Sequence, residues 1–358
     1  MNLVKKVMPS IRFTLVLGLL LIVTLTGCSK NTQTSSQSAT KIEPRGKAYF
    51  SFFDTVSYVY SYVGDSDELF NERTDAVADI LDKYHKLFDI YYEYTGINNL
   101  CTINKLAGGE PVEVDKELVD FLLYCKEIYN LTDGKVNVMM GSVLSIWHDA
   151  RTSDTPYLPE ESGLEEASRH VAFDALEIDQ VNCTVRITDP EASLDVGAIG
   201  KGYATEMAAR WLEEQGISGY VLNIGGNVRI VGTKPSGEGW VTGIKDPKNP
   251  DTAFALKLNL ADCSCVTSGE YERYFTVDGV RYSHIIDPAT LYPATYFASV
   301  SVITRDSAYA DSLSTALYCM SYEEGLEFVS KLGDVECVWV FHDGEVKYTS
   351  GLEDLIVK

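Results

Sequence analysis

The stretch "LDVGAIGKGYATE", residues 194–206, places three glycines around Lys201 immediately before a run with helical spacing. A glycine-rich turn that opens a helix offers free backbone N–H groups and the positive end of the helix dipole to an anion. The spacing nevertheless fits neither of the two common phosphate-binding motifs. A Walker loop requires glycine where this chain has Asp195, and the dinucleotide pattern GxGxxG is absent. The stretch by itself leaves two interpretations open, a tight structural turn and an anion site.

Segments on both sides of this turn carry strand and helix patterns. The predicted elements are a strand at 48–64, helices at 67–91, 115–132 and 203–216, a strand and loop at 193–202, a hairpin at 219–235 turning at Gly225–Gly226, a turn at Asp278–Gly279, a strand running into a helix at 298–320, and a hairpin at 335–350. Mixed, mainly antiparallel strands with packed helices predict an α+β fold. Because no second linker or repeat is visible, we expect a single elaborated domain.

The first 27 residues predict a signal peptide. Lys5, Lys6 and Arg12 surround the start of a 13-residue apolar run, which is too short for a membrane-spanning helix. "LTGC" then ends at Cys28, the pattern of a bacterial lipobox, which implies cleavage before Cys28 and a lipid on its thiol. The alternative is an ordinary cleaved signal or an N-terminal anchor. We expect an exported protein, lipid-anchored on the outer face of the cytoplasmic membrane.

The mature chain then divides into a tether and a folded part. Residues 28–46 are rich in serine and threonine and nearly free of apolar side chains, so they predict a flexible tether. Residues 47–358 remain for the folded domain. They are enough to bury a large core.

The charge balance argues against nucleic acid as a partner. The chain has a net charge of −22, and removal of the signal peptide takes away three basic residues and no acidic one, which leaves −25. Phosphate backbones are bound by basic surfaces. The same charge disfavours any anionic ligand, unless a metal ion and a nearby lysine reverse the local field.

Seven cysteines remain after Cys28, without the spacing of a zinc site or of a disulfide framework. Cys263 and Cys265, in "CSC", form a candidate redox pair. The alternation of the surrounding sequence favours instead two residues on one face of a strand.

Two further groups carry candidate chemistry. Asp311 and Thr315, in "YADSLSTALYCM", lie four residues apart on a predicted helix and therefore on one face. A carboxylate and a hydroxyl placed in this way can both reach one hard cation such as Mg²⁺, whose other positions take water and phosphate oxygens. The alternative is a polar helix edge. His284, in "RYSHIIDPAT", is a candidate acid or base, or a group that orients a phosphate; the alternative is a surface strand residue.

In their order along the chain these motifs resemble the FAD:protein FMN transferases, the ApbE family. The motifs are "FDT", "DVGAIGKGYA", "LNIGGNV", "TSGEYERYF", "YSHIIDP" and "ADSLSTALY", and the resemblance runs from about Tyr49 to the C-terminus, essentially the whole folded domain. It implies an ApbE or T-fold-like catalytic domain with FAD as substrate and Mg²⁺ as cofactor. The implied reaction transfers FMN to a Thr or Ser hydroxyl of an acceptor protein, expected to be a membrane or exported redox protein, and releases AMP.

The resemblance also implies roles for single residues. Asp195 and Lys201 would contact FAD, and the main-chain oxygen of Ala198 would be a magnesium ligand. Asp311 and Thr315 would be the side-chain ligands, and Asp311 would thereby be catalytic.

On the flavin side, the resemblance makes His284 important for transfer and Ile285 part of the FAD site. Trp147 matches a tryptophan near the flavin, and Phe53 would pack against the flavin where relatives have methionine. Leu291 stands where the family's "DPxTG" turn has glycine. Flavin packing is the part of the resemblance that these departures leave open.

Two other functions remain open from the sequence. With water as the acceptor, the same residues would make a magnesium-dependent FAD pyrophosphatase that releases FMN and AMP. A non-catalytic lipoprotein that captures flavin or another solute is the second. The pair Asp311 and Thr315 favours an enzyme, because a simple solute receptor needs no such metal site.

Overall fold

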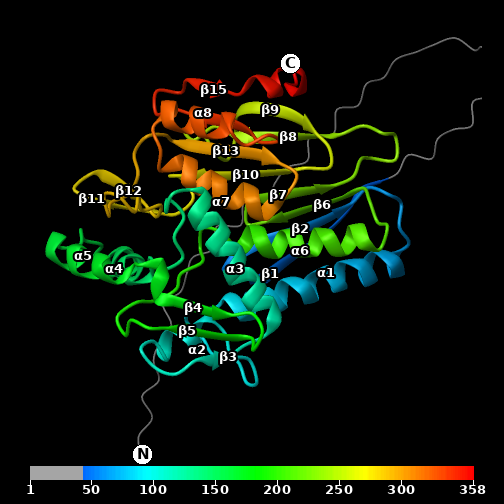
Figure 1. Ribbon diagram of the computed structural model, residues 1–358. Coiled ribbons are helices and arrows are strands. Elements are labelled where there is room, and N and C mark those ends of the chain that lie inside the picture. The colour runs from blue at the N-terminus through cyan, green and yellow to red at the C-terminus, as the bar shows by residue number, and fades with distance from the viewer. Residues whose placement is uncertain (1–42) are drawn as a thin grey trace, which may run out of the picture. The chain divides into compact units, whose positions relative to one another are not determined.

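An eight-stranded antiparallel sheet organises residues 43–358, the part of the chain that the computed structural model describes (Figure 1). In spatial order its strands are β1 (Arg45–Phe52), β2 (Thr55–Ser61), β6 (Tyr220–Ile224), β7 (Asn227–Val231), β10 (Ser264–Gly269), β13 (Ser299–Thr304), β14 (Glu336–Val340) and β15 (Val346–Tyr348). The expected α+β fold with a mainly antiparallel sheet is confirmed. The predicted signal peptide and Cys28 lie outside the described residues, and β1 begins at Arg45 and so includes the last two residues of the predicted tether.

The prediction of one strand over 48–64 is wrong, because the segment folds back on itself as the hairpin β1–β2. Phe53 and Asp54 form its two-residue turn with φ values of 53° and 51°, and Phe52 pairs with Thr55 across it. Positive φ at both turn residues is the geometry that matches the twist of the flanking strands. The sequence gives no warning of the turn, since neither position is the glycine or asparagine that such turns usually carry.

The hairpin β6–β7 confirms the predicted turn at Gly225–Gly226. Both glycines have positive φ, 58° and 97°. A side chain at Gly225 would come within 2.6 Å of the Thr55 side chain, because β2 pairs with β6 and brings the two hairpin turns together. The turn therefore requires glycine for its conformation and for its contact.

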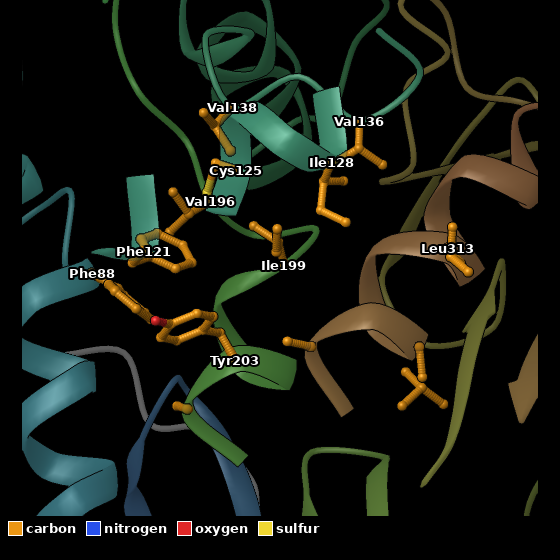
Figure 2. Close-up of a cluster of buried hydrophobic side chains, with 14 of the residues drawn as sticks. Phe88, Phe121, Cys125, Ile128, Val136, Val138, Val196, Ile199, Tyr203 and Leu313 are labelled. Atoms are coloured by element: carbon orange, nitrogen blue, oxygen red, sulfur yellow. The ribbon is translucent and has the colours of Figure 1, made fainter. Parts of the chain in front are cut away.

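Helices cover one face of the sheet and bury the main core against it. They are α1 (Asp67–Phe88), α6 (Gly200–Glu214) and α7 (Ser307–Tyr318), with α3 (Lys116–Leu131) packed behind them. Figure 2 shows part of this core, where Phe88, Phe121 and Tyr203 converge from three different helices. The rings of Phe88 and Phe121 are stacked with centroids 3.9 Å apart, and the edge of Tyr203 meets Phe121 at 4.9 Å.

The opposite face of the sheet is covered by the hairpin β8 (Trp240–Lys245) and β9 (Phe254–Leu260), which encloses a second apolar cluster. Cys263 and Cys265 both contact this cluster, and both are free thiols. Burial raises the pKa of Cys263 to about 11 and that of Cys265 to about 12. Because the thiolate is the reactive form, these thiols are unreactive core residues, and the redox interpretation has no support.

The remaining elements surround the helical side. They are α2 (Leu100–Lys105), α4 (Gly141–Thr152), α5 (Glu161–Ala167), α8 (Tyr322–Ser330), the small sheet of β3 (Val112–Glu113), β5 (Thr184–Ile187) and β4 (Leu176–Asp179), the hairpin β11 (Tyr274–Val277) and β12 (Val280–Ser283), and 3-10 turns at Ser168–His170, Phe173–Ala175 and Ser350–Leu355. Hairpin β11–β12 turns at Asp278–Gly279 as predicted. Within residues 43–358, no helix has the length and apolar character needed to cross a bilayer.

Candidate active site

The glycine-rich stretch forms an irregular turn that leads into α6. The expected strand before it is reduced to one bridge between Ser193 and Met140. The side chain of Asn104 replaces a strand partner, since its Nδ2 donates to the Leu194 carbonyl at 2.9 Å and its Oδ1 accepts from the Leu194 N–H at 2.7 Å. The Asp195 N–H donates to the carbonyl of Val138 at 2.8 Å. Hydrogen bonds from a side chain and from another loop therefore satisfy the backbone groups of this segment. No local pattern in the sequence indicates such bonds.

Residues of the turn alternate between core and surface with a period of three. Val196 and Ile199 are buried, and Figure 2 shows both pointing into the helical core. Asp195, Ala198 and Lys201 occupy the half-buried positions between them. The three residues predicted to contact FAD and magnesium thus share the outer side of one turn.

Gly202 joins this turn to α7. Gly202 is the third residue of α6, in the first turn, where backbone N–H groups have no partner within the helix. Its N–H donates to Oδ2 of Asp311 at 2.7 Å. Ala198 precedes the helix, so its carbonyl oxygen lies outside the regular helical hydrogen bonds, and the Asp311 carboxylate is brought to the same turn. Two of the predicted magnesium ligands are therefore placed together by one hydrogen bond.

This contact requires that residue 202 has no side chain. A Cβ there would lie 2.3 Å from the Cβ of Asp311 and 2.5 Å from the Ser307 carbonyl oxygen. The second glycine of "GKG" is thus needed for helix packing, and the backbone of α6 touches α7 at this point. The α6 and α7 ribbons lie side by side in Figure 1.

Asp311 is a buried carboxylate, 6% exposed. Burial raises its pKa, and the charge of Lys201 and the Gly202 N–H oppose that shift. The buried Asn227 also favours the charged carboxylate, although its Nδ2 has no hydrogen-bond partner among the described residues. A buried amide without a partner indicates that a polar group belongs beside it.

Thr315 lies one turn further along α7 and is half-buried. Its Oγ1 is 3.4 Å from Oγ of Ser268, which in turn lies 2.9 Å from Oγ of Ser314. Ser268 is the penultimate residue of strand β10, in the motif "TSGEYERYF". The predicted ligand pair is thus on one face of a real helix, and Ser268 is a neighbouring hydroxyl that the sequence did not single out.

The donor set fits a hard cation. One carboxylate, one hydroxyl and one main-chain oxygen leave room for water and phosphate oxygens, which is how Mg²⁺ is usually held. Such a set does not need a cluster of acidic residues, and residues 43–358 contain no group of three or more His, Cys, Asp or Glu side chains placed to bind a metal.

His284 follows β12 and faces the same lysine. Its Nδ1 lies 3.0 Å from the carbonyl oxygen of Arg273, and its backbone N–H donates to that oxygen at 3.1 Å. A carbonyl can only accept, so Nδ1 carries the proton and Nε2 holds the free lone pair. Burial, and after it the charges of Lys201, Arg273 and Arg151, lower the pKa of His284 to about 4. The imidazole is therefore neutral at pH 7.

Three cations converge where the overall charge of the protein is strongly negative. The charge of Lys201 acts on the pKa of Asp195, His284 and Asp311 alike, which places all three around one lysine. Burial raises the pKa of Asp195, and Lys201 and Arg151 oppose this shift. The Asp195 carboxylate also accepts a hydrogen bond from the Gly197 N–H at 2.8 Å. These cations are groups that an anionic ligand could contact.

Arg151 and Arg273 were missed by the sequence analysis. Arg273 stands inside the quoted motif "TSGEYERYF", so that motif was the available signal. Arg151 lies on α4, for which no helix was predicted, and one of its nitrogens is 3.4 Å from Nδ1 of His148. The hydroxyl of Tyr91 is also 3.4 Å from Nδ1 of His148. Only the tertiary structure brings these groups to Asp195.

Phe53 lies in the β1–β2 turn. Its ring meets the ring of His85 edge-on at 5.5 Å, and its N–H donates to Nδ1 of His85 at 3.3 Å. The positive φ of Phe53 is a strained conformation for a bulky side chain, and such strain is typical of functional turns.

Trp147 and Ile285 are buried, 4% and 7% exposed. Trp147 packs on Phe275 and Tyr292, and its Nε1–H donates to the Leu291 carbonyl at 2.9 Å. Trp147 thus contacts the Leu291 turn directly, and its N–H is already occupied. Leu291 itself has a φ of 64°, a left-handed conformation that glycine adopts more readily than leucine.

A separate cavity of about 290 Å³ lies beside this region, lined among others by Lys248, Glu270, Arg281 and His342. It contains none of the predicted site residues. The site is therefore assigned from the convergence of Asp195, Lys201, His284, Asp311 and Thr315 and not from this cavity.

The chain is similar to proteins of one family. The sequence model of the ApbE family matches residues 54–339. A FAD:protein FMN transferase of Treponema pallidum is 31% identical over 271 residues, which cover 72% of this chain and 74% of the relative. One of Klebsiella pneumoniae is 29% identical over 254 residues, with 71% and 78% covered. The crystal structure of the ApbE protein from Thermotoga maritima superposes with a TM-score of 0.78 at 27% identity, covering 88% of this chain and all of that one. The flavin transferase ApbE from Vibrio cholerae shares the fold, with a TM-score of 0.73 at 24% identity and coverage of 87% and 99%. This chain belongs to the ApbE family.

Proposed function

We propose that the protein is a FAD:protein FMN transferase that uses Mg²⁺ and attaches FMN to a Thr or Ser hydroxyl of an acceptor protein. The observation that carries the proposal is the hydrogen bond from Gly202 to Asp311, which brings the Asp311 carboxylate to the glycine-rich turn that holds Ala198 and Lys201. The relatives named FAD:protein FMN transferase support the reaction class.

In this proposal the acceptor hydroxyl attacks the phosphorus atom on the FMN side of the FAD pyrophosphate. A phosphoester bond forms, the bond to the bridging oxygen breaks, and AMP leaves with that oxygen. Bound Mg²⁺ would neutralise pyrophosphate oxygens and stabilise the charge that develops on the leaving phosphate. Ala198, Asp311 and Thr315 are the residues that would hold the ion.

The chain's own cations bind and orient the pyrophosphate. Lys201, Arg151 and Arg273 together reverse the negative field of the protein around the site. Burial is the main cause of the low pKa of His284, about 4, and these cations add to it. A bound pyrophosphate would oppose the part of that lowering that comes from the cations. Nε2 can then accept the proton of the attacking hydroxyl.

A direct assay tests the reaction. The protein is incubated with FAD, Mg²⁺ and a candidate acceptor domain, and the acceptor is examined by mass spectrometry. An FMN adduct on the acceptor with equimolar AMP supports the transferase. FMN and AMP without an adduct on any acceptor would instead establish a FAD pyrophosphatase, and stoichiometric FAD binding without turnover would establish a binding protein.

We propose in addition that the mature protein is exported and held at the outer face of the cytoplasmic membrane by a lipid on Cys28. The positive start, the short apolar run and "LTGC" support this location. Metabolic labelling with an alkyne fatty acid should mark the wild-type protein and not Cys28→Ala, and the variant should leave the membrane fraction. Equal labelling of both would refute the assignment.

A further inference from the structure

A second contact between α6 and α7 lies one helical turn away from Gly202 and Asp311. Glu206 follows Gly202 by one turn on α6, and Ser307 precedes Asp311 by one turn on α7. Oε2 of Glu206 accepts a hydrogen bond from the Ser307 N–H at 2.8 Å. Ser307 is the first residue of α7, so this bond satisfies one of the N–H groups that a helix start leaves open. The two helices are thus joined at two successive turns.

Glu206 is itself held from several directions. It is 4% exposed, and its Oε1 accepts from Nε of Arg210 at 3.1 Å. Its Oε2 also accepts from Nε of Arg229 at 3.3 Å. Arg229 is fully buried on β7, and its other nitrogen pairs with Glu213 at 2.6 Å. The carboxylate that bonds to α7 is therefore anchored to α6 and to the sheet.

The packing allows little movement of one helix along the other. Because α6 touches α7 at Gly202, the distance between the helices is at its minimum there. A slide of α7 along α6 would take Asp311 away from the Gly202 N–H. That N–H, which lies in the first turn of α6, would then lose this acceptor. Both changes would disturb the oxygen atoms that a magnesium ion would need.

We propose that Glu206 is a positioning residue for the metal ligands. Through the Ser307 N–H it fixes the place of α7 along α6, and thereby the spacing between the Asp311 carboxylate and the Ala198 carbonyl oxygen. Mg²⁺ requires near-octahedral geometry at short distances, so small errors in this spacing weaken its binding. The identity of the ion rests on the proposed function, whereas the alignment of the helices does not.

Four variants test the proposal. Glu206→Ala removes the acceptor, and Glu206→Gln keeps an acceptor oxygen. Ser307→Pro removes the N–H donor and the buried hydroxyl of Ser307, at a first helical position where proline is well tolerated. Glu213→Gln is the matched control, because it also contacts Arg229 from α6 but makes no bond to α7. The measurements are the Mg²⁺ concentration that gives half-maximal FMN transfer, kcat at saturating Mg²⁺, and hydrogen exchange of the Gly202 amide without FAD or metal.

The expected results separate positioning from general destabilisation. Glu206→Ala and Ser307→Pro should each raise the half-saturating Mg²⁺ concentration about tenfold, the loss that follows removal of a charge-assisted hydrogen bond. Their kcat should change little, and their Gly202 amide should exchange faster. Glu206→Gln keeps an oxygen for the Ser307 N–H and should restore most of the Mg²⁺ dependence, while Glu213→Gln should match the wild type.

Other results would overturn the proposal. A folded Ser307→Pro protein with wild-type Mg²⁺ dependence and wild-type Gly202 protection would show that the Glu206 bond does not position the ligands. Equal losses in Glu213→Gln and Glu206→Ala would show a general stability effect. If the wild type catalyses no Mg²⁺-dependent transfer, the proposed function fails, and the exchange of Gly202 still decides whether Glu206 aligns the helices.

Discussion

Two walls of the candidate site are built in contrasting ways. The helix wall consists of α6 and α7 around Gly202 and Asp311, where backbones touch and buried groups are hydrogen-bonded. The turn wall consists of the Phe53–Asp54 turn, the Arg273–His284 base of hairpin β11–β12, and the Leu291 turn. Residues of the turn wall have positive φ or are more exposed. Strict geometry for a metal is thus provided by packed helices, whereas the side that would meet flavin and acceptor is carried on loops.

The largest expected effect comes from breaking the helix wall at its centre. Asp311→Ala should lower Mg²⁺-dependent FMN transfer about a thousandfold or more, because a metal contributes several kcal/mol to charge stabilisation and this variant removes its only carboxylate ligand. Initial rates of acceptor labelling at several Mg²⁺ concentrations measure the loss. Ser312→Ala, a neighbouring buried position on α7 whose hydroxyl donates to the Ala308 carbonyl at 2.8 Å, is the control. Unchanged rates in Asp311→Ala would mean that the metal site is elsewhere.

The turn wall should respond next at His284. His284→Gln is expected to lower transfer about a hundredfold, the usual contribution of a general base. The measurement is kcat with saturating FAD and Mg²⁺, with His342→Gln as the control. A wild-type rate in His284→Gln would assign the proton transfer to another group.

The low pKa of His284 also predicts a pH effect on stability. The folded value is about 4 and the ordinary value 6.5, so the unfolded chain binds more protons at this residue between those limits. This contribution to the free energy of unfolding is present above pH 6.5 and is lost as the pH falls toward 4. Urea unfolding of the FAD-free protein should therefore show a shallower loss over this range for His284→Gln than for the wild type. Parallel curves would contradict the lowered pKa.

Lys201 stands between the two walls and should affect FAD more than the metal. Lys201→Ala is expected to weaken FAD binding roughly tenfold to a hundredfold, as for the loss of a hydrogen bond to a charged group. Calorimetric titrations with FAD and with Mg²⁺ compare the two effects, and Lys201→Arg is the variant that keeps the charge. A larger loss for Mg²⁺ than for FAD would reject the phosphate role of Lys201.

The smallest expected effect is a difference in the free energy of unfolding between two variants of Leu291, in the turn wall. Both Leu291→Gly and Leu291→Ala remove the side chain that packs near Trp147, but only glycine adopts a φ of 64° without strain. We expect the glycine variant to have the larger free energy of unfolding, by about 1 kcal/mol. Chemical denaturation of both variants measures the difference. Equal stability would show that this turn is not strained.

The helix wall could be predicted from the sequence better than the turn wall. The helix spacing of Asp311 and Thr315 and the glycine-rich opening of α6 were both readable, because helical periodicity and glycine content are local signals. The turn at Phe53–Asp54 was missed because its residues are not those that favour positive φ. Arg151 was missed because α4 has no pattern that marked it, and its role depends on contact with segments far away in the chain.

The sequence by itself determined the α+β class, the helix that carries Asp311 and Thr315, the hairpin at Gly225–Gly226, and the family resemblance through six ordered motifs. Each of these is encoded in residues that are near one another in the chain. Only the tertiary structure decided that the Gly202 N–H bonds to Asp311, that Glu206 bonds to the first residue of α7, and that Arg151 and Arg273 act on His284 together with Lys201. These depend on contacts between distant segments, where the close approach of two helices and the burial of charge set the geometry.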